Sequence, residues 1–200
     1  MIRVIAGKFK SRQLRTLPGD AIRPTSDRLK ETLFNVLQTE IEGRKFLDCY
    51  AGTGSIGIEA LSRGASYVAF IESSARAARV LRENLRQLGL FPSAQCLLLN
   101  KPVEEGLKIM EKAELKFDIV FLDPPYAAAE EYPMVLRKLC AYGILEDQAI
   151  VMAEHSKKIA VAAETPGLTR VREVKQGDSI LTFYRELEYA KTRRDLSGIL

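Results

Sequence analysis

The chain has 200 residues, enough for one domain of ordinary size with a small appendage. Hydrophobic residues make up 46% of it and charged residues 28%, so it can bury a core of its own. No apolar run approaches the roughly 18 to 20 residues of a membrane helix, and the N-terminal sequence lacks the pattern of a secretory signal. Cys49, Cys96 and Cys140 are widely spaced and form no metal-ligand pattern. We therefore expect a cytoplasmic protein with reduced thiols, no metal and no membrane partner.

The positive charge is concentrated at the N-terminal end. The formal net charge is +4, but residues 1–30 contain eight basic and two acidic side chains. A basic extension on a near-neutral body is typical of proteins that contact phosphates, although a solvated tail would account for the charge equally well. If this extension contacts phosphates, the candidate residues are Lys8, Lys10, Arg12, Arg23 and Arg28.

The first elements in chain order are a hairpin and a helix. Alternation from Arg3 to Ala6, followed by Gln13–Leu14, predicts a small hairpin with Gly7 near its turn. Either Thr25 or Ser26 can then cap a helix that follows Pro24.

From residue 46 onward, strands and helices alternate. The predicted strands are 46–50, 67–71, 94–99, 117–122 and 149–153, and the predicted helices are 56–63, 75–88, 103–112 and 130–141. This order predicts a doubly wound, mostly parallel α/β sheet with helices on both faces. Residues 169–175 and 179–186 flank Gly177–Asp178 and predict a hairpin. We therefore expect a Rossmann-like, seven-stranded sheet with an antiparallel C-terminal hairpin strand.

A glycine-rich turn follows the first strand of this series. Gly52, Gly54 and Gly57 match the G-x-G-x-x-G pattern, and Glu72 lies twenty residues after Gly52 at the end of the next strand. This arrangement is the fingerprint of a dinucleotide-binding site. Asp48 argues against a dinucleotide, because a carboxylate at this turn would repel a pyrophosphate. S-adenosylmethionine carries an ammonium and a sulfonium instead, so the pattern favours that cofactor, with Glu72 accepting hydrogen bonds from the ribose hydroxyls.

The stretch Asp123-Pro124-Pro125-Tyr126 follows a buried strand. Ligands bind at the carboxyl edge of such sheets, where Asp48, Glu72 and Asp123 should all emerge. Two acceptors, the Asp123 carboxylate and the Pro124 carbonyl, would orient an aromatic amine for attack on a methyl group. The two prolines stiffen the loop, and Tyr126 offers a ring for base stacking. The motif predicts methyl transfer to the amino group of a nucleobase.

These motifs are similar to those of a known class of enzymes. Asp48-Cys-Tyr-Ala-Gly-Thr-Gly54, Glu72 and Asp123-Pro-Pro-Tyr126 resemble class I S-adenosylmethionine-dependent methyltransferases acting on nucleobase amines. Arg3-Val-Ile-Ala-Gly7 and the stretch Arg23-Pro-Thr-Ser-Asp-Arg-Leu-Lys-Glu-Thr-Leu-Phe-Asn35 are similar to the RsmD family, whose members methylate N2 of one guanine in bacterial 16S ribosomal RNA. The likeness covers residues 2–187.

The resemblance implies a function and a set of site residues. It implies a monomer that methylates ribosomal RNA within the small subunit, with a basic extension at 1–24, a methyltransferase domain at 25–187 and a tail at 188–200. The residues implied to hold the cofactor are Asp48, Ala51, Gly52, Thr53, Gly54, Glu72, Ser73, Asn100 and Val103; those implied to hold the amine are Asp123, Pro124, Pro125 and Tyr126.

Three features depart from this pattern or stand outside it. Pro102 occupies the position where the family usually has an acidic or amide side chain near the adenine, so Asn100 or a backbone group would hold the adenine amine. His155, the single histidine, is expected to be structural. Arg79, Arg82 and Arg86 are expected on the solvated face of their helix.

Other functions stay open at the level of the sequence. The same motif suits a DNA or RNA methyltransferase acting on adenine N6 or cytosine N4. A protein-amide methyltransferase fits less well, because its motif commonly begins with asparagine where this chain has Asp123. A non-catalytic RNA-binding assembly factor would have no need of the intact glycine turn.

Overall fold

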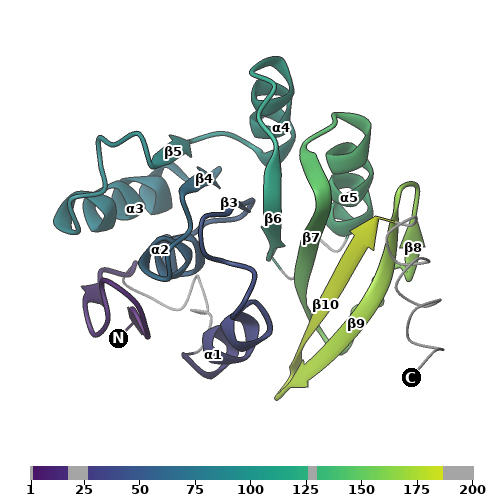
Figure 1. The fold of residues 1–200 in the computed structure, drawn as a ribbon, viewed down its shortest axis with the longest axis horizontal. Helices are drawn as coiled ribbons and strands as arrows, with labels where there is room; N and C mark the ends of the chain where they lie inside the picture. The colour runs from purple at the N-terminus through teal and green to yellow at the C-terminus, as the bar shows by residue number, and fades with distance from the viewer. Residues whose placement is uncertain (1, 18–26, 126–129, 187–200) are drawn as a thin grey trace. The chain divides into compact units, whose positions relative to one another are not determined.

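The structure is a computed structural model that describes residues 2–17, 27–125 and 130–186 (Figure 1). The predicted cap at Thr25 or Ser26, together with Arg23 and Tyr126, lies outside these residues. The chain forms two compact units, Met1–Gly106 and Leu107–Leu200. Among the described residues, no helix is long and apolar enough to cross a membrane.

The first unit is built on three parallel strands in the order β5-β4-β3. They are β3 (Lys45–Asp48), β4 (Tyr67–Ile71) and β5 (Cys96–Leu99). All side chains of β4 after its first residue are buried. Such a continuous apolar run is typical of a parallel strand covered on both faces.

Four helices lie among the described residues of this part of the chain. They are α1 (Asp27–Val36), α2 (Ser55–Ser62), α3 (Ala75–Gln87) and α4 (Val103–Lys112), the last of which continues into the second unit. Helix α2 is buried along almost its whole length and contacts β3 and β4. Helix α3 begins at a side-chain cap, in which the Ser74 hydroxyl accepts a 3.3 Å hydrogen bond from the Ala77 amide.

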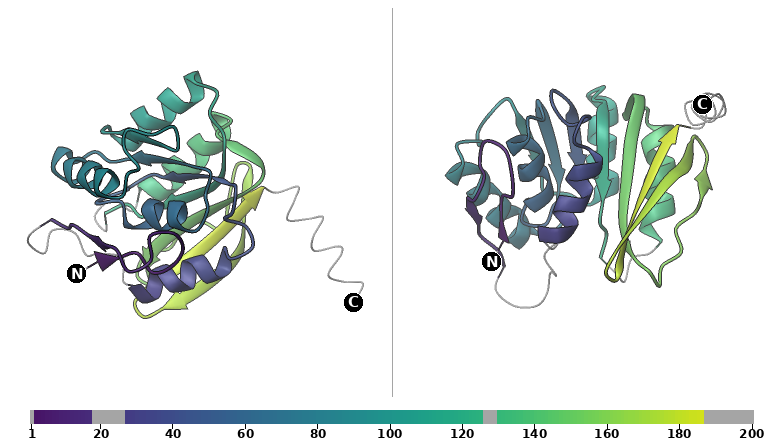
Figure 2. Two further views of the ribbon diagram at one scale, coloured as in Figure 1. Left: turned by 60° about the vertical axis from the view of Figure 1, so that its left-hand side comes forward. Right: turned by 60° about the horizontal axis from the view of Figure 1, so that its bottom comes forward.

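The predicted N-terminal hairpin is present. Its strands β1 (Ile2–Arg3) and β2 (Gln13–Leu14) pair antiparallel, and Figure 2 shows the hairpin beside α2. Each strand has only two residues, so the pairing by itself is too short to be stable. The hairpin therefore depends on contacts with the helices of the first unit.

The described residues of the second unit contain the remaining strands, the end of α4 and one further helix. Strand β6 (Phe117–Leu122) pairs parallel with β7 (Leu145–Ser156), and the order continues β7-β10-β9-β8 through antiparallel pairs. The last strands are β8 (Glu164–Thr165), β9 (Leu168–Gln176) and β10 (Ser179–Glu186). Helix α5 (Glu131–Ala141) contacts β7 and β8.

The predicted fold class is confirmed: the chain is α/β, with a large, mostly parallel sheet, an antiparallel C-terminal hairpin and a small N-terminal hairpin. Element bounds shift by one or two residues elsewhere, and the larger differences from the prediction lie in the second unit. Strand β7 extends beyond residues 149–153, because pairing with β10 continues to Ser156 opposite Ser179. The short β8 adds an eighth strand to the seven that the sequence predicted.

Candidate active site

Of the three glycines in the motif at the start of α2, only Gly52 borders open space. Gly52 has a φ of +54°, and a Cβ built on it would meet no atom within 4 Å. A Cβ on Gly54 would lie 2.1 Å from Leu81 Cδ1, and one on Gly57 would lie 2.2 Å from the Phe70 ring. Gly54 and Gly57 are therefore required by packing, whereas Gly52 borders the space that a ligand could fill.

Asp48 ends β3 as a buried carboxylate, with 1% of its surface exposed. The Gly57 amide donates a 3.1 Å hydrogen bond to its Oδ2. Burial, together with the nearby charge of Glu72, raises the pKa of Asp48 to about 7, although hydrogen bonds from the Gly57 and Tyr50 amides act in the opposite direction. Burial removes water from the Asp48 carboxylate and so disfavours its negative charge. A cationic ligand beside the carboxylate would offset this loss of hydration.

Glu72, directly after β4, is fixed by two backbone amides. Gly52 donates to its Oε2 and Ser74 donates to its Oε1, each at 2.7 Å. Burial raises the pKa of Glu72, and these two hydrogen bonds lower it. Each oxygen accepts one of these bonds, and a carboxylate oxygen can accept a second. The carboxylate is thus oriented beside Gly52 with acceptor capacity for two hydroxyl groups.

Asn100 follows β5 and reaches back to the segment after β4. Its Nδ2 donates to the backbone carbonyls of Glu72, at 2.7 Å, and Ser73, at 3.1 Å. The first unit therefore brings Asp48, Gly52, Glu72 and Asn100 together at the carboxyl ends of three adjacent strands. This grouping is the one that the sequence predicted for the cofactor site.

The other predicted cofactor residues occupy the same loops in different environments. The Ala51 amide donates to the Ile71 carbonyl at 3.0 Å, and Ala51 is buried. Ser73 is exposed, Thr53 is half-buried, and Val103 is buried at the first position of α4. Ser73 and Thr53 offer polar groups at the loop, whereas Ala51 and Val103 offer only apolar surface and backbone.

The predicted amine-binding motif lies in the second unit. Asp123 follows the last residue of β6 and is half-buried, Pro124 is buried, and Pro125 is exposed. Tyr126 lies outside the described residues. The buried strand and the buried proline fix the position of Asp123 within this unit.

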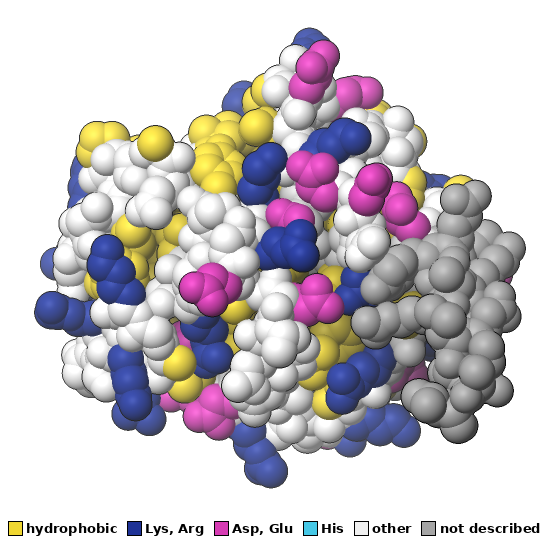
Figure 3. Space-filling model, in the orientation of Figure 1, with side chains coloured by type: hydrophobic (Ala, Val, Ile, Leu, Met, Phe, Trp, Pro, Cys, Tyr) yellow, Lys and Arg dark blue, Asp and Glu magenta, His cyan; other side chains and the backbone are white. Residues whose placement is uncertain are grey.

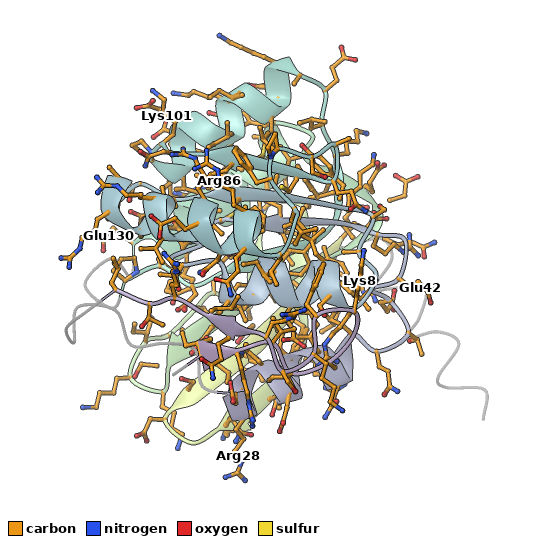
Figure 4. The ribbon with its side chains drawn as sticks, turned by 90° about the vertical axis from the view of Figure 1, so that its left-hand side faces the viewer. Lys8, Arg28, Glu42, Arg86, Lys101 and Glu130 are labelled. Carbon is orange, nitrogen blue, oxygen red and sulfur yellow. The ribbon has the colours of Figure 1, made fainter. Side chains whose placement is uncertain are left out.

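The basic residues predicted to contact nucleic acid lie on the surface wherever they are described. Lys8, Lys10 and Arg12 are exposed in the hairpin, and Arg28 is exposed on α1. Figure 4 labels Lys8 and Arg28 among the side chains drawn as sticks. Arg23 lies outside the described residues.

Three buried polar residues that the sequence analysis did not single out attach the hairpin to the first unit. Glu59 of α2 accepts hydrogen bonds from the amides of Ile5 at 2.7 Å and Ala6 at 3.0 Å. Ser62 accepts from the Phe9 amide at 2.9 Å. The sequence did contain one signal for Glu59, which is the single carboxylate in the apolar segment Ile56–Leu61. A carboxylate that is buried in such a segment requires hydrogen-bonding partners.

The third of these residues, Asn84 of α3, joins the N-terminal segment to the glycine loop. Its Oδ1 accepts from the Arg15 amide at 2.8 Å, and its Nδ2 donates to the carbonyls of Arg15 at 3.1 Å and Thr53 at 2.9 Å. Asn84 is fully buried. One amide side chain thus spans the segment after the hairpin and the loop of the candidate cofactor site.

His155 has structural contacts. Its ring is buried in β7, with Nε2 2.8 Å from Thr182 Oγ1 on the paired strand β10. The expectation that it serves the fold agrees with this packing. Among the described residues, no group of three or more His, Cys, Asp or Glu is placed to hold a metal ion.

The architecture defines a methyltransferase fold. The Escherichia coli protein yhhF, described provisionally as a methyltransferase, has a solved structure that matches with a TM-score of 0.77 at 28% identity, covering 92% of this chain and 97% of that chain. The solved structure of HI0767 from Haemophilus influenzae, described provisionally as a methylase, matches with a TM-score of 0.73 at 31% identity, covering 93% and 98%.

The sequence comparisons then identify the family. The family described as conserved hypothetical protein 95 matches residues 2–185. Ribosomal RNA small subunit methyltransferase D of Haemophilus influenzae is 39% identical over 158 residues, which cover 78% of this chain and 79% of that protein. The protein of the same name from Escherichia coli K12 is 34% identical over 155 residues, covering 76% and 74%. This chain belongs to the conserved hypothetical protein 95 family, and the resemblance to the RsmD family is confirmed.

Proposed function

We propose that the chain is an S-adenosylmethionine-dependent ribosomal RNA methyltransferase that transfers a methyl group to the exocyclic N2 amine of a guanine in 16S RNA. The observation that carries the proposal is the grouping of Asp48, Gly52 and Glu72 in the first unit. Family membership supports the same conclusion, since two relatives are named ribosomal RNA small subunit methyltransferase D.

The residues of the first unit fit S-adenosylmethionine. The buried Asp48 carboxylate suits the ammonium group, because a cation there would favour the charged form that burial penalises. Glu72 suits the two ribose hydroxyls, because both of its oxygens are oriented by backbone amides. Gly52 leaves room for the ligand against the backbone. The cofactor, when bound, supplies an electrophilic methyl group on a sulfonium.

The adenine amine would be held by Asn100. Its Nδ2 is committed to the Glu72 and Ser73 carbonyls, which fixes the orientation of the amide. The Oδ1 atom is an acceptor and suits the N–H groups of an adenine amine. This assignment accounts for Pro102 at a position where the family usually has a side chain that can form hydrogen bonds.

In the second unit, residues 123–126 would hold the target amine. The guanine amine is a poor nucleophile, because its lone pair is delocalised into the ring. The Asp123 carboxylate and the Pro124 carbonyl would each accept one N–H, which localises the lone pair and directs it toward the methyl group. Tyr126 would stack on the base. The proton lost after transfer is acidic enough to leave without a dedicated histidine.

The basic hairpin would hold the RNA phosphates. Exposed lysine and arginine side chains suit phosphate contacts, and a base-modifying enzyme requires a nucleotide turned out of its stack. Replacing Lys8, Lys10 and Arg12 together with alanine should weaken RNA binding and lower the log–log salt slope by about 0.7 to 0.9 for each phosphate that is no longer neutralised. Cofactor affinity measured by calorimetry should stay at the parental value; a parental salt slope would refute the assignment.

The test of the function uses tritiated cofactor. Small subunits, large subunits, transfer RNA and DNA are prepared from a strain that lacks the enzyme, and each is offered to the protein and to Asp123→Ala as a control. We expect label in the small subunit alone, recovered as N2-methylguanosine. Label recovered from DNA as N6-methyladenine would show that the target is adenine and not guanine. The absence of label from all four substrates would favour a non-catalytic assembly factor.

A further inference from the structure

Helix α3 presents an unusual concentration of arginine. Its 13 residues include four arginines and one acidic residue, Glu83, which is already paired with Arg15 at 2.8 Å. We call the four the arginine face of α3; its members are Arg76, Arg79, Arg82 and Arg86. Within the described part of the chain, none of them forms an ion pair. Their charge is not neutralised by the described residues.

The arginine face is accessible and lies on one side of the helix. Arg76, Arg79 and Arg86 are exposed, and Arg82 is half-buried. Residues three, four or seven positions apart lie close together around a helix, so the spacing of the four arginines produces a continuous stripe. From Arg76 to Arg86 the stripe rises about 15 Å, at 1.5 Å per residue. The backbone of a nucleic-acid duplex carries several phosphates over that length.

One end of the stripe is organised by an aromatic ring. The guanidinium carbons of Arg82 and Arg86 lie 6.0 and 5.8 Å from the centroid of the Phe91 ring. These distances suit cation–π contacts, which limit the freedom of the two side chains without neutralising their charge. Two planar donors are thus held in place at the surface.

The arginine face adjoins the N-terminal basic segment. The Arg15–Glu83 ion pair and the hydrogen bonds of Asn84 to the Arg15 backbone join the segment after the hairpin to α3. Figure 3 shows Lys and Arg side chains spread over the side of the molecule where Figure 1 places α3 and the hairpin. Figure 4 labels Lys8 of the hairpin and Arg86 of α3 in one view. The buried Asn84 also donates to the Thr53 carbonyl, so α3 contacts the glycine loop of the candidate cofactor site as well.

We propose that the arginine face of α3 binds the phosphate backbone of the RNA substrate, beside the strand held by the N-terminal hairpin. Guanidinium groups match phosphate geometry through paired N–H donors. An anionic membrane fits less well, because membrane-surface helices insert an apolar face, whereas the apolar residues Ala77, Ala78, Leu81 and Leu85 of α3 are buried in the first unit. The inference rests on the proposed function in naming the RNA as ribosomal.

The test removes charge from α3 and measures RNA affinity over a series of salt concentrations. Arg76→Ala/Arg79→Ala is the first variant, since both side chains are exposed and neither forms an ion pair with a described residue. The probes are ribosomal RNA extracted from small subunits, a short RNA hairpin, vesicles of anionic phospholipid and polyglutamate. Arg172→Ala/Lys175→Ala, which removes two exposed charges from β9, is the matched control. Arg76→Lys/Arg79→Lys tests whether charge alone is sufficient.

We expect the alanine pair to lower the log–log salt slope by about 1.4 to 1.8, the value for two phosphates that are no longer neutralised, with cofactor affinity unchanged and the β9 control at parental values. The lysine pair should keep most of the slope. If the alanine pair shows the same salt slope as the parent, the inference about α3 is overturned. The proposed function would still stand if the parent methylates small subunits. Failure of the parent to methylate any RNA would refute the proposed function, but a reduced slope would still support RNA binding by α3. Loss of binding only to anionic vesicles or polyglutamate would overturn the choice of RNA.

Discussion

Replacing Asp48 with asparagine should change how stability depends on pH. In the free protein, burial raises the pKa of Asp48 to about 7 from an ordinary value of 3.8. Below about pH 4 the group is protonated in both the folded and the unfolded chain. Between about pH 4 and pH 7 the unfolded chain releases the proton and the folded chain keeps it, so the free energy of unfolding falls as the pH rises.

The size of this effect follows from the two pKa values. Their difference of about three pH units corresponds to about 4 kcal/mol of stability lost by pH 8, at 1.36 kcal/mol per unit. Asp48→Asn removes that dependence, but it replaces one acceptor oxygen of the carboxylate with an NH2 group that can only donate, which leaves one acceptor fewer for the Gly57 and Tyr50 amides. The unsatisfied donor costs about 1 to 3 kcal/mol. The variant should therefore gain stability relative to the parent as the pH rises from 5 to 8, and should be at least as stable as the parent at pH 8.

The same titration should control cofactor affinity. At pH 6 only about one in ten Asp48 side chains carries the charge that attracts the ammonium, so the apparent Kd should rise about tenfold between pH 8 and pH 6. In Asp48→Asn, binding should be weak and nearly independent of pH. Glu72→Gln is the necessary control, because burial also raises the pKa of Glu72.

Urea unfolding at pH 5, 6, 7 and 8 measures the stability effect, and calorimetry with the demethylated cofactor product measures binding. Parallel stability curves for the parent and Asp48→Asn would show that Asp48 is ionised throughout this range, which would refute the reasoning from burial. Unchanged cofactor affinity in the variant would refute its role in binding the ammonium.

Three further predictions concern the loop, the chemistry and the hairpin. Gly52→Val should abolish cofactor binding, detected by calorimetry, because the side chain would fill the open space and favours a negative φ; native far-ultraviolet circular dichroism would show that the fold is retained. Asp123→Ala should lower turnover at least ~100-fold with cofactor affinity unchanged, and a parental rate would remove Asp123 from the proposed chemistry. Glu59→Gln should cost about 2 to 4 kcal/mol in urea unfolding and speed amide exchange in the hairpin, because its three partners lose a buried carboxylate. The exposed pair provides its control: Glu83→Gln should cost less than about 1 kcal/mol, and equal costs for the two variants would contradict the hairpin's dependence on Glu59.

Local signals in the sequence determined the order of the elements. Strands and helices alternate with distinct hydrophobic periods, so the ends of α4 and β6 match their predicted ranges of 103–112 and 117–122. The same signals determined which polar residues gather at the sheet edge. Because consecutive parallel strands end on the same side, Asp48 at the end of β3 and Glu72 directly after β4 could be assigned to one site.

Tertiary packing decided the features that depend on contacts between distant residues. The sequence does not distinguish the three glycines of the motif. In the structure, a side chain on Gly54 would overlap Leu81 and one on Gly57 would overlap Phe70, whereas Gly52 faces open space. Burial and neighbouring groups, not the residue type, raise the pKa of Asp48. The roles of Glu59 and Asn84 depend on partners 53 to 69 residues away in the sequence. No local pattern encodes such pairings, because a buried polar group is satisfied by whichever donor or acceptor the folded chain brings to it.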